Sequence, residues 1–318
     1  MVLAEQSQSR CRIGTRQSRL ARIQAEALQN ALRLAHGPIA DIEIEAIRTS
    51  GDWRPGQGEV RLSQAQGGKG LFVREIEHAL LAGDIDCGTH SLKDLPSDVP
   101  EGLRIAYMLP ASDPRDALLS MKYSSIEDMP EGAVIGTSSL RRQSMLLHMR
   151  PDLYVTTLRG NVTTRIEKMQ AGQVDAAILA YAGLLRLGMD DEVTSVLDTD
   201  IVLPACGQGV ICVEVRADDT AMHDWLAPVH CRSTGLRCAA ERTALGVLGG
   251  TCHTPIGAFA ELDDDNRMRL RLGVAYADGS QRYDRDETAR IRDEDDAAEL
   301  GRMTGRRLRD EMPSDILT

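Results

Sequence analysis

Residues 84–94 read Asp-Ile-Asp-Cys-Gly-Thr-His-Ser-Leu-Lys-Asp, a short strand pattern that runs into a polar cluster. An apolar helical pattern from Leu71 to Ala82 precedes this segment, and Pro96 closes it, because proline stops regular structure. The exit of a strand is the usual place for a site in an open α/β sheet. The cluster of imidazole, hydroxyl, ammonium and carboxylate at residues 90–94 is therefore a candidate site, with a solvated loop as the alternative.

Composition limits the classes of function. The chain has 318 residues, which is enough for two or three domains, and 42% are hydrophobic, as in ordinary globular proteins. Only 3% are aromatic, which disfavours a base-stacking surface for single-stranded nucleic acid. The net charge of −11 disfavours a polyanion-binding surface over the whole molecule, yet residues 137–186 hold seven basic and three acidic side chains. This contrast indicates a specific anion pocket.

Cysteine usage and hydropathy bear on the compartment. The seven cysteines form no CxxC pair, which favours reduced thiols in a cytosolic protein and gives no metal-binding pattern. No segment approaches 18 consecutive apolar residues, and residues 1–10 lack the apolar core of a signal peptide. We therefore expect a cytoplasmic protein that binds neither membrane nor metal.

Periodicity predicts alternating strands and helices along the chain. Apolar residues at 20, 23, 27, 31 and 34 keep helical spacing, which predicts one buried helix face, and alternation at 42, 44 and 46 predicts a strand. The remaining expected elements are strands at 11–15, 103–109, 133–135, 175–180, 210–215 and 268–276, and helices at 71–82, 163–171, 233–248 and 290–310.

A second α/β unit begins at 133–142, where Gly136-Thr-Ser-Ser-Leu-Arg-Arg142 leads from a strand into a helix. Backbone N–H groups and the positive end of the helix dipole favour an anion there. Ser138 or Ser139 could simply cap the helix. Arg141 and Arg142 are harder to explain as caps, because cations in the first turn oppose the dipole.

Arginines recur where loops meet helices, and guanidinium groups suit bidentate recognition of carboxylates or phosphates. Each one alone is explained as a surface residue, but the set is not. Gly67-Gly-Lys-Gly70 resembles a phosphate loop only superficially, since Ser63 and Gly70 break the Walker pattern. The recurrent arginines are Arg16, Arg141, Arg142, Arg159, Arg165 and Arg186.

Cys252 follows a helix that ends at Gly249-Gly250, and His253 lies beside it. A catalytic thiolate would need a partnered histidine, and a metal site would need further ligands at set spacing. A covalent attachment point needs only an accessible thiol. On spacing alone, an ordinary buried cysteine is the simplest explanation.

Several motifs occur together in the order that is typical of one enzyme family. The chain resembles porphobilinogen deaminase, also called hydroxymethylbilane synthase, over roughly residues 11–300. The motifs that carry the resemblance are Ile13-Gly-Thr-Arg-Gln-Ser-Arg-Leu-Ala21, Gly67-Gly-Lys-Gly-Leu-Phe72, His90-Ser-Leu-Lys-Asp94, Gly136-Thr-Ser-Ser-Leu-Arg-Arg142, Arg159-Gly-Asn-Val162, Pro204-Ala-Cys-Gly-Gln-Gly209 and Cys252-His-Thr-Pro-Ile-Gly257.

The resemblance implies three domains. Two similar α/β units of the type II periplasmic-binding-protein kind would comprise residues 1–109 with 210–228, and residues 110–209. A small α/β domain would comprise residues 229–318 and carry Cys252. The implied reaction joins four porphobilinogens head to tail, with loss of ammonia, to give the linear tetrapyrrole hydroxymethylbilane in tetrapyrrole biosynthesis. The chain would be a monomer whose only partners are porphobilinogen and the growing oligopyrrole.

The resemblance also implies residue roles. Asp94 would be the catalytic carboxylate that stabilises transient cations, at a value of about 3–4 kcal/mol for such a preorganised group. Cys252 would carry the dipyrromethane cofactor as a thioether. The other implied cofactor-binding residues are Lys93, Ser91, Thr137, Ser138, Ser139, Arg141, Arg142, Arg165 and Gly160. The implied substrate-binding residues are Arg16, Arg159, Arg186, Lys69 and Ser18.

Three departures and two rivals accompany this interpretation. Thr251 replaces a glycine before the attachment cysteine, the strand before His90 reads Asp86-Cys-Gly-Thr89 and is less apolar than usual, and the loop at 53–66 is longer than in bacterial-type members. A non-catalytic solute-binding or sensor protein would use the same two-lobed fold without Cys252. A phosphoryl-transfer enzyme would use Gly67–Gly70 and require nucleotide and Mg²⁺.

Overall fold

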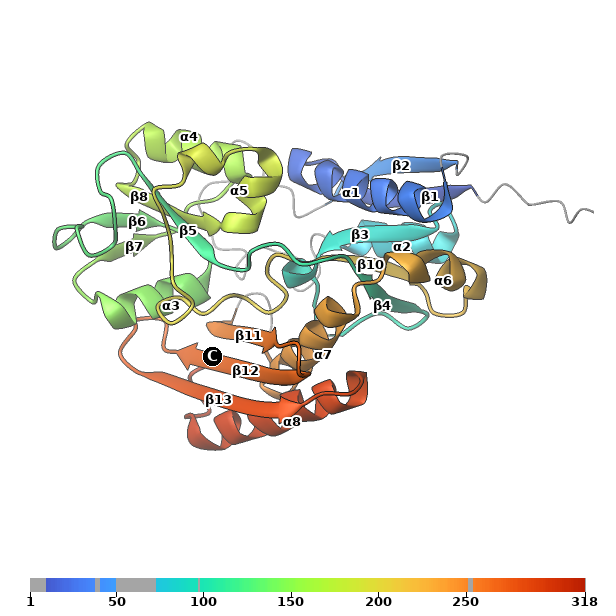
Figure 1. Cartoon of the computed structure of the whole chain (residues 1–318). Helices are drawn as coiled ribbons and strands as arrows, with labels where there is room; N and C mark the ends of the chain where they lie inside the picture. Colours follow the sequence, from blue (N-terminus) through green and yellow to red (C-terminus); the bar gives the residue numbers. More distant parts are fainter. Residues whose placement is uncertain (1–9, 38–40, 50–72, 97, 251–253, 318) are drawn as a thin grey trace, which may run out of the picture.

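The central strand of the first sheet is β3 (Cys87–Ser91), the strand predicted at the start of the polar cluster. The structure, a computed structural model, describes residues 10–37, 41–49, 73–96, 98–250 and 254–317. The predictions for Lys69, the loop at 53–66, Gly67–Gly70, Thr251 and Cys252 concern residues outside the described ranges. Figure 1 shows two sheets side by side, with a third sheet and α8 (Glu294–Glu311) below them.

The first sheet has the order β2-β1-β3-β10-β4. Strands β2, β1 and β3 are parallel, whereas β10 is antiparallel to both β3 and β4. Its core includes Ile13, Leu28 and Val213, which are fully buried. Its other strands are β1 (Cys11–Arg16), β2 (Ile42–Ile47), β4 (Leu103–Met108) and β10 (Ile211–Arg216), and its helices are α1 (Arg19–His36), α2 (Arg74–Ala82) and α6 (Thr220–Leu226).

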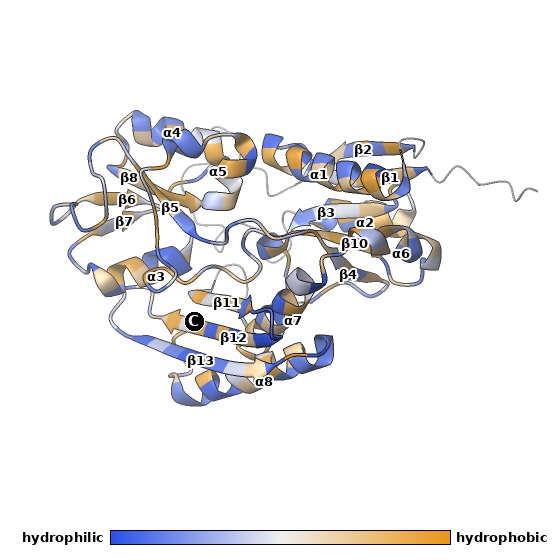
Figure 2. Ribbon diagram, viewed as in Figure 1, coloured by the Kyte–Doolittle hydropathy of each residue, from blue (hydrophilic) through white to orange (hydrophobic). Residues whose placement is uncertain are grey.

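The second sheet repeats this topology in the order β7-β6-β8-β5-β9, with three parallel strands followed by antiparallel β5. The expectation of two similar α/β units is therefore confirmed. In Figure 2 the face of α4 in view is largely hydrophilic, while its Ile166 and Met169 are buried. The elements are β5 (Asp116–Ser120), β6 (Val134–Gly136), β7 (Tyr154–Thr156), β8 (Ala176–Ala180), β9 (Ser195–Val196), α3 (Leu140–Met149), α4 (Val162–Gln170) and α5 (Tyr181–Leu187).

Two connections join the sheets. The chain leaves the first sheet after β4, builds the whole second sheet, and returns as β10 between β3 and β4 (Figure 1). The returning segment passes over the short 3-10 helix η2 (Leu92–Asp94), because the Leu92 N–H donates to the Val210 carbonyl oxygen at 3.0 Å. Gly207 has a φ of 68°, and an added Cβ would lie 2.6 Å from Leu92 Cγ. The close approach of these segments therefore requires glycine.

The third sheet is an antiparallel meander of β11 (Ile256–Leu262), β12 (Arg267–Ala275) and β13 (Arg282–Arg290). Helix α7 (Arg232–Val247) and α8 pack with it around one core that includes Leu236, Ala244, Leu270 and Leu300. The short 3-10 helices η3 (Asp190–Glu192) and η4 (Ala227–Val229) complete the described elements. No helix in the described ranges is long and apolar enough to cross a membrane.

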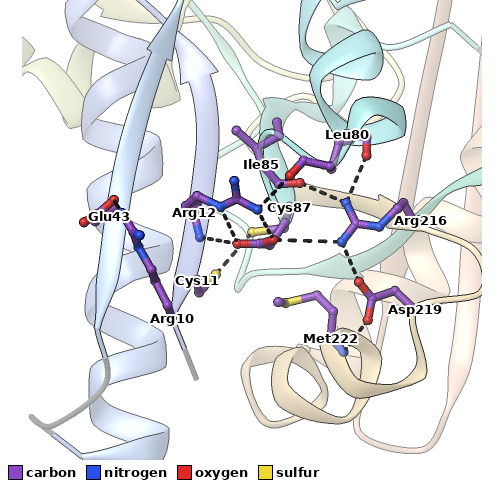
Figure 3. Close-up of polar contacts among 12 residues, drawn as sticks. Arg10, Cys11, Arg12, Glu43, Leu80, Ile85, Cys87, Arg216, Asp219 and Met222 are labelled. Atoms are coloured by element: carbon purple, nitrogen blue, oxygen red, sulfur yellow. Dashed lines mark hydrogen bonds and ion pairs between the residues drawn. The ribbon is translucent and has the colours of Figure 1, made fainter. Parts of the chain in front are cut away.

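A polar network that includes Arg12, Arg216 and Asp219 lies at the beginning of β3 (Figure 3). Asp86 accepts hydrogen bonds from the backbone N–H and the guanidinium of Arg12, at 2.8–3.1 Å. Arg216 on β10 donates to the Leu80 and Ile85 carbonyl oxygens at 2.9 Å and pairs with Asp219 at 2.6 Å. Strands β1, β3 and β10 are thus joined at the end opposite the polar cluster.

One predicted surface was only partly right. In the apolar stripe that ends at Leu34, Ala27 and Ala31 pack partly buried against the core of the first sheet, but Leu34 is 89% exposed. The buried residues of α1 are instead Ala21, Gln24, Ala25, Leu28 and Leu32. Apolar residues cover much of this helix, so its packing against the first sheet, rather than spacing, selects the buried stripe.

Candidate active site

A cavity of about 700 Å³ is lined by the first two sheets and the helices that begin at their strand ends. Among the described residues that line it, Asp94 is the only acid. This lining contrasts with the net charge of −11 of the whole chain. The basic residues that line the cavity within the described ranges are eight: Arg16, Arg19, Arg48, Lys93, Arg142, Arg159, Arg165 and Arg186.

Contacts of the neighbouring residues hold the backbone at Asp94 in place. It ends η2, directly after β3, and the preceding Leu92 is buried beneath the returning segment that contains Gly207. The Leu95 N–H closes the turn on the Leu92 carbonyl oxygen at 3.1 Å. These contacts fix the backbone from which the carboxylate of Asp94 extends along the cavity wall.

Lys93 lies between the two sheets. Its ammonium donates to Gln208 Oε1 at 3.2 Å. Burial lowers the pKa of Lys93 to about 8, and the positive charge of Arg142 acts in the same direction, while Asp94 and Asp116 oppose it. The ammonium is therefore held in a site where an anionic ligand would restore its usual affinity for the proton.

Asp116 is the buried hub of the second sheet. Its side chain is fully buried and accepts hydrogen bonds from Arg141 at 2.8 Å, Arg142 at 2.7 Å and Gln208 Nε2 at 2.8 Å. Burial alone would raise the pKa of Asp116, but attraction to both arginines outweighs burial and holds it well below its usual range. Through Gln208, this hub is also connected to Lys93.

The adjacent residues Arg141 and Arg142 therefore pair with an anion of the protein itself, the carboxylate of Asp116. Arg141 donates to Asp116 and to the Leu203 carbonyl oxygen at 2.6 Å, and it does not belong to the described cavity lining. Arg142 also binds Asp116 and the Ile178 carbonyl oxygen at 3.0 Å, yet it lines the cavity. The conflict with the helix dipole is thus resolved at least partly by Asp116, a partner that the sequence did not suggest.

Helix beginnings supply the opposite wall. Ser139 caps α3 and accepts from the Arg142 N–H at 3.4 Å, while the Ser138 hydroxyl donates to the Leu158 carbonyl oxygen at 2.6 Å. Asn161 caps α4 and accepts from the Thr164 N–H at 2.8 Å. The alternative explanation, that the serine caps the helix, therefore holds for Ser139.

Arginines flank this wall. Arg165 Nε donates to the Gly160 carbonyl oxygen at 2.8 Å, and Gly160 has a φ of 116° that favours glycine. Arg186 donates to the Gly209 carbonyl oxygen at 2.5 Å, and burial lowers its pKa. Backbone carbonyls thus aim two guanidinium groups at the cavity.

Most of the predicted site residues come together in this one cavity. Thr137, Ser139 and Arg141 lie beside it but outside its described lining, and Lys69 and Cys252 lie outside the described residues. The predicted residues that line the cavity are Asp94, Lys93, Ser91, Ser138, Arg142, Arg165, Gly160, Arg16, Arg159, Arg186 and Ser18.

Several lining residues were not predicted. Gln24 is buried, and its amide donates to Ser91 Oγ at 2.7 Å, so it orients a predicted site residue. Arg19 could have been suspected because, like Arg141, it is a cation in the first turn of a helix. Arg48 gave no signal beyond its place at the end of a strand. Within the described ranges, no group of three or more His, Cys, Asp or Glu side chains could hold a metal ion.

Two family models match the chain. "Porphobilinogen deaminase, dipyromethane cofactor binding domain" matches residues 11–224, and "Porphobilinogen deaminase, C-terminal domain" matches residues 235–310. A periplasmic substrate-binding protein of an ABC transporter from Coxiella burnetii aligns with a TM-score of 0.41 at 13% identity, over 70% of this chain and 93% of that chain.

Curated relatives extend over nearly the whole chain. The porphobilinogen deaminase of Nitrobacter hamburgensis is 44% identical over 94% of this chain and 92% of its own length. That of Paracoccus denitrificans is 44% identical over 97% and 96%, and the chloroplastic enzyme of Oryza sativa is 42% identical over 96% and 85%. With both family domains matched, including the one that binds the dipyrromethane cofactor, the chain belongs to the porphobilinogen deaminase family.

Proposed function

We propose that the chain is a hydroxymethylbilane synthase that acts at the cavity lined by Asp94. The observation that carries this proposal is that the described lining residues include one carboxylate, Asp94, and eight basic side chains. Porphobilinogen has an acetate and a propionate on its pyrrole ring, and it becomes cationic at the reacting carbon when ammonia leaves. A site that is cationic at its walls and anionic at one point complements this charge distribution.

Asp94 is the proposed catalytic residue. Its carboxylate stabilises the cation that forms at the substrate when ammonia leaves, and it accepts hydrogen bonds from pyrrole N–H groups. Fixing this carboxylate on η2 means that little reorganisation is needed when charge develops. No proton needs to be assigned to Asp94 for this electrostatic role.

The lining also fits the dipyrromethane cofactor. When bound, this group supplies the terminal pyrrole carbon to which the first substrate unit is joined. Its carboxylates require several cations and hydroxyl donors, and the cavity offers both, from Lys93 and Arg142 to the hydroxyls of Ser91 and Ser138. Arg165 and Gly160 would also bind the cofactor. Thr137, Ser139 and Arg141 would hold these binding residues in place. Cys252 remains the proposed attachment residue.

The substrate carboxylates are assigned to the remaining cations. Arg16, Arg159 and Arg186 line the same cavity as Asp94, together with Ser18, and Lys69 is proposed to join them. Guanidinium groups bind carboxylates in a bidentate manner, so they fix the orientation of the ring as well as its charge. The incoming unit is thereby aligned for bond formation beside Asp94.

We propose that the chain forms three domains. The first comprises residues 1–109 with 210–228, the second residues 110–209 and the third residues 229–318, and the three separate sheets support this division. We propose a monomer, as the resemblance to the family implies, and sedimentation velocity tests this. We propose a cytoplasmic location, supported by six free cysteines in the described ranges, of which Cys11 and Cys87 lie 3.9 Å apart between sulfurs without a bond.

Intact mass spectrometry combined with turnover tests the function. The wild-type protein should carry a mass excess of two condensed pyrrole units, which Cys252→Ala should lose, and it should consume porphobilinogen without nucleotide or Mg²⁺. An unmodified but active wild type would contradict the cofactor assignment. A protein that binds porphobilinogen without turnover would instead be a solute-binding protein.

A matched pair of variants tests Asp94. Asp94→Asn should keep the fold and lose roughly 100- to 1,000-fold in turnover, as expected when a preorganised charge partner is removed. Asp98→Asn, at an exposed carboxylate outside the cavity lining, is the control and should keep wild-type turnover. Near wild-type turnover in Asp94→Asn would remove Asp94 from the central role.

A further inference from the structure

Two basic residues of the cavity lining, Arg19 and Arg48, have no role in the site as proposed above. Arg19 is the first residue of α1, directly after its N-cap Ser18. Arg48 directly follows the end of β2. The parallel register places Arg16 opposite Ile47, so Arg48 and the turn from β1 into α1 share one edge of the first sheet.

This corner of the cavity faces the second sheet. Leu20 of α1 approaches α5, since a Cβ added to Gly183 would lie 3.7 Å from Leu20 Cδ2. Arg19 precedes Leu20, and both line the cavity together with Gly183. Arg19 therefore stands where the first domain meets the second, and Arg48, which is also exposed, lines the same cavity from the end of β2. We call these two residues the rim pair.

Among the described cations of the cavity, the rim pair differs in having guanidinium groups without a hydrogen-bond or ion-pair partner in the described residues. Arg142 binds Asp116, Arg165 binds the Gly160 carbonyl oxygen, and Lys93 binds Gln208. Within the described part of the chain, neither guanidinium of the rim pair makes a hydrogen bond or an ion pair, and both side chains are exposed.

The position of Arg19 also reduces the stability of α1. It is a cation in the first turn of α1, and that turn contains no acid. A cation there opposes the helix dipole by roughly 0.3–1 kcal/mol. An anion at the rim would reverse this penalty, because it would meet both the arginine and the positive end of the helix.

The reaction provides such anions in increasing number. Every unit that is joined to the chain adds an acetate and a propionate, while the inner cations stay the same. Cations that suffice for the cofactor and the first unit do not suffice for the last. Later units therefore need further positive charge at the edge of the inner cavity.

We propose that the rim pair binds carboxylates of the later units of the growing oligopyrrole. Arg19 and Arg48 are binding residues for elongation, not for the first condensation. This inference rests on the proposed function and adds a direction to it: the growing chain extends from Asp94 toward the beginning of α1 and the end of β2.

The test is the distribution of covalent enzyme–substrate adducts after addition of limiting porphobilinogen to the holoenzyme, measured by intact mass spectrometry. The variants are Arg19→Gln, Arg48→Gln, the double variant, and Arg48→Lys, which keeps the charge. Arg22→Gln is the matched control, since Arg22 is exposed on α1 but does not line the cavity.

Each single neutral variant should slow the late additions by up to about fivefold, as expected for one exposed ion pair. The double variant should combine both effects, so that adducts with fewer units accumulate while the rate of the first addition stays at the wild-type value. Arg48→Lys and Arg22→Gln should give the wild-type distribution.

A wild-type distribution in the double variant would overturn this inference, and so would an equal slowing of every addition. Absence of any adducts from the wild-type enzyme would instead overturn the proposed function. The two failures are therefore distinguished by the wild-type spectrum alone.

Discussion

Replacing Asp116 by asparagine removes the negative charge that two buried arginines share. The side chains of Arg141 and Arg142 are only 3% and 7% exposed, and both guanidinium groups lie within 2.8 Å of the carboxylate. Breaking a buried pair by removal of one partner costs about 3–5 kcal/mol, because the remaining charge stays buried. Two charges are left here, so we expect a loss at the upper end of that range.

Urea unfolding at neutral pH measures this loss, with Asp152→Asn as the control. Asp152 pairs with Arg150 at 2.6 Å, but the two side chains are 32% and 21% exposed. An ion pair open to solvent contributes at most about 1 kcal/mol. If Asp116→Asn is destabilised no more than Asp152→Asn, burial of the Asp116 hub does not stabilise the second domain in the way argued here.

Three further outcomes are expected. Burial lowers the pKa of Lys93 to about 8, so loading of the cofactor onto the apoenzyme should slow as pH increases through that value, and Lys93→Arg should keep the loading rate constant; a pH-dependent loading rate in that variant would point to another group. Burial raises the pKa of Glu241 from 4.5 to about 7, so between these pH values the folded protein holds a proton that the unfolded chain has lost; as pH rises from 4.5 to 7 this group should lower the unfolding free energy by roughly 3 kcal/mol, and Glu241→Gln should lose that contribution, whereas an unchanged pH dependence in Glu241→Gln would contradict it. Gly207→Ala should cost about 1–3 kcal/mol more in thermal unfolding than Gly172→Ala, because both glycines have positive φ but only Gly207 faces a close neighbour, Leu92; equal losses would show that this contact relaxes freely.

Most of the alternation of strands and helices could be predicted from periodicity, but β5, β7 and β9 of the second sheet, with five, three and two residues, were missed. The strand at 87–91 and the helix at 232–247 needed only local pattern. The buried face of α1 could not be predicted, since apolar residues cover more of that helix than the sheet can bury. There the choice of Leu32 over Leu34 depends on contacts with distant strands.

Within the site, recurrence of arginine at helix starts located the cavity but could not assign partners. Arg141 and Arg142 carry the same charge at adjacent positions, yet only Arg142 lines the cavity. Their partner Asp116 is the first residue of β5, a strand that the sequence patterns did not predict. The partner of a buried charge is fixed by the fold, and an isolated aspartate has no periodicity to reveal it.

The place of β10 between β3 and β4 has a consequence for synthesis on the ribosome. Residues 211–216 emerge only after the entire second sheet, so β4 has no neighbour in the first sheet until then. An unpaired strand edge invites association with other chains. A nascent chain that stalls before residue 211 should therefore expose β4 and aggregate, although its second domain has all of its strands.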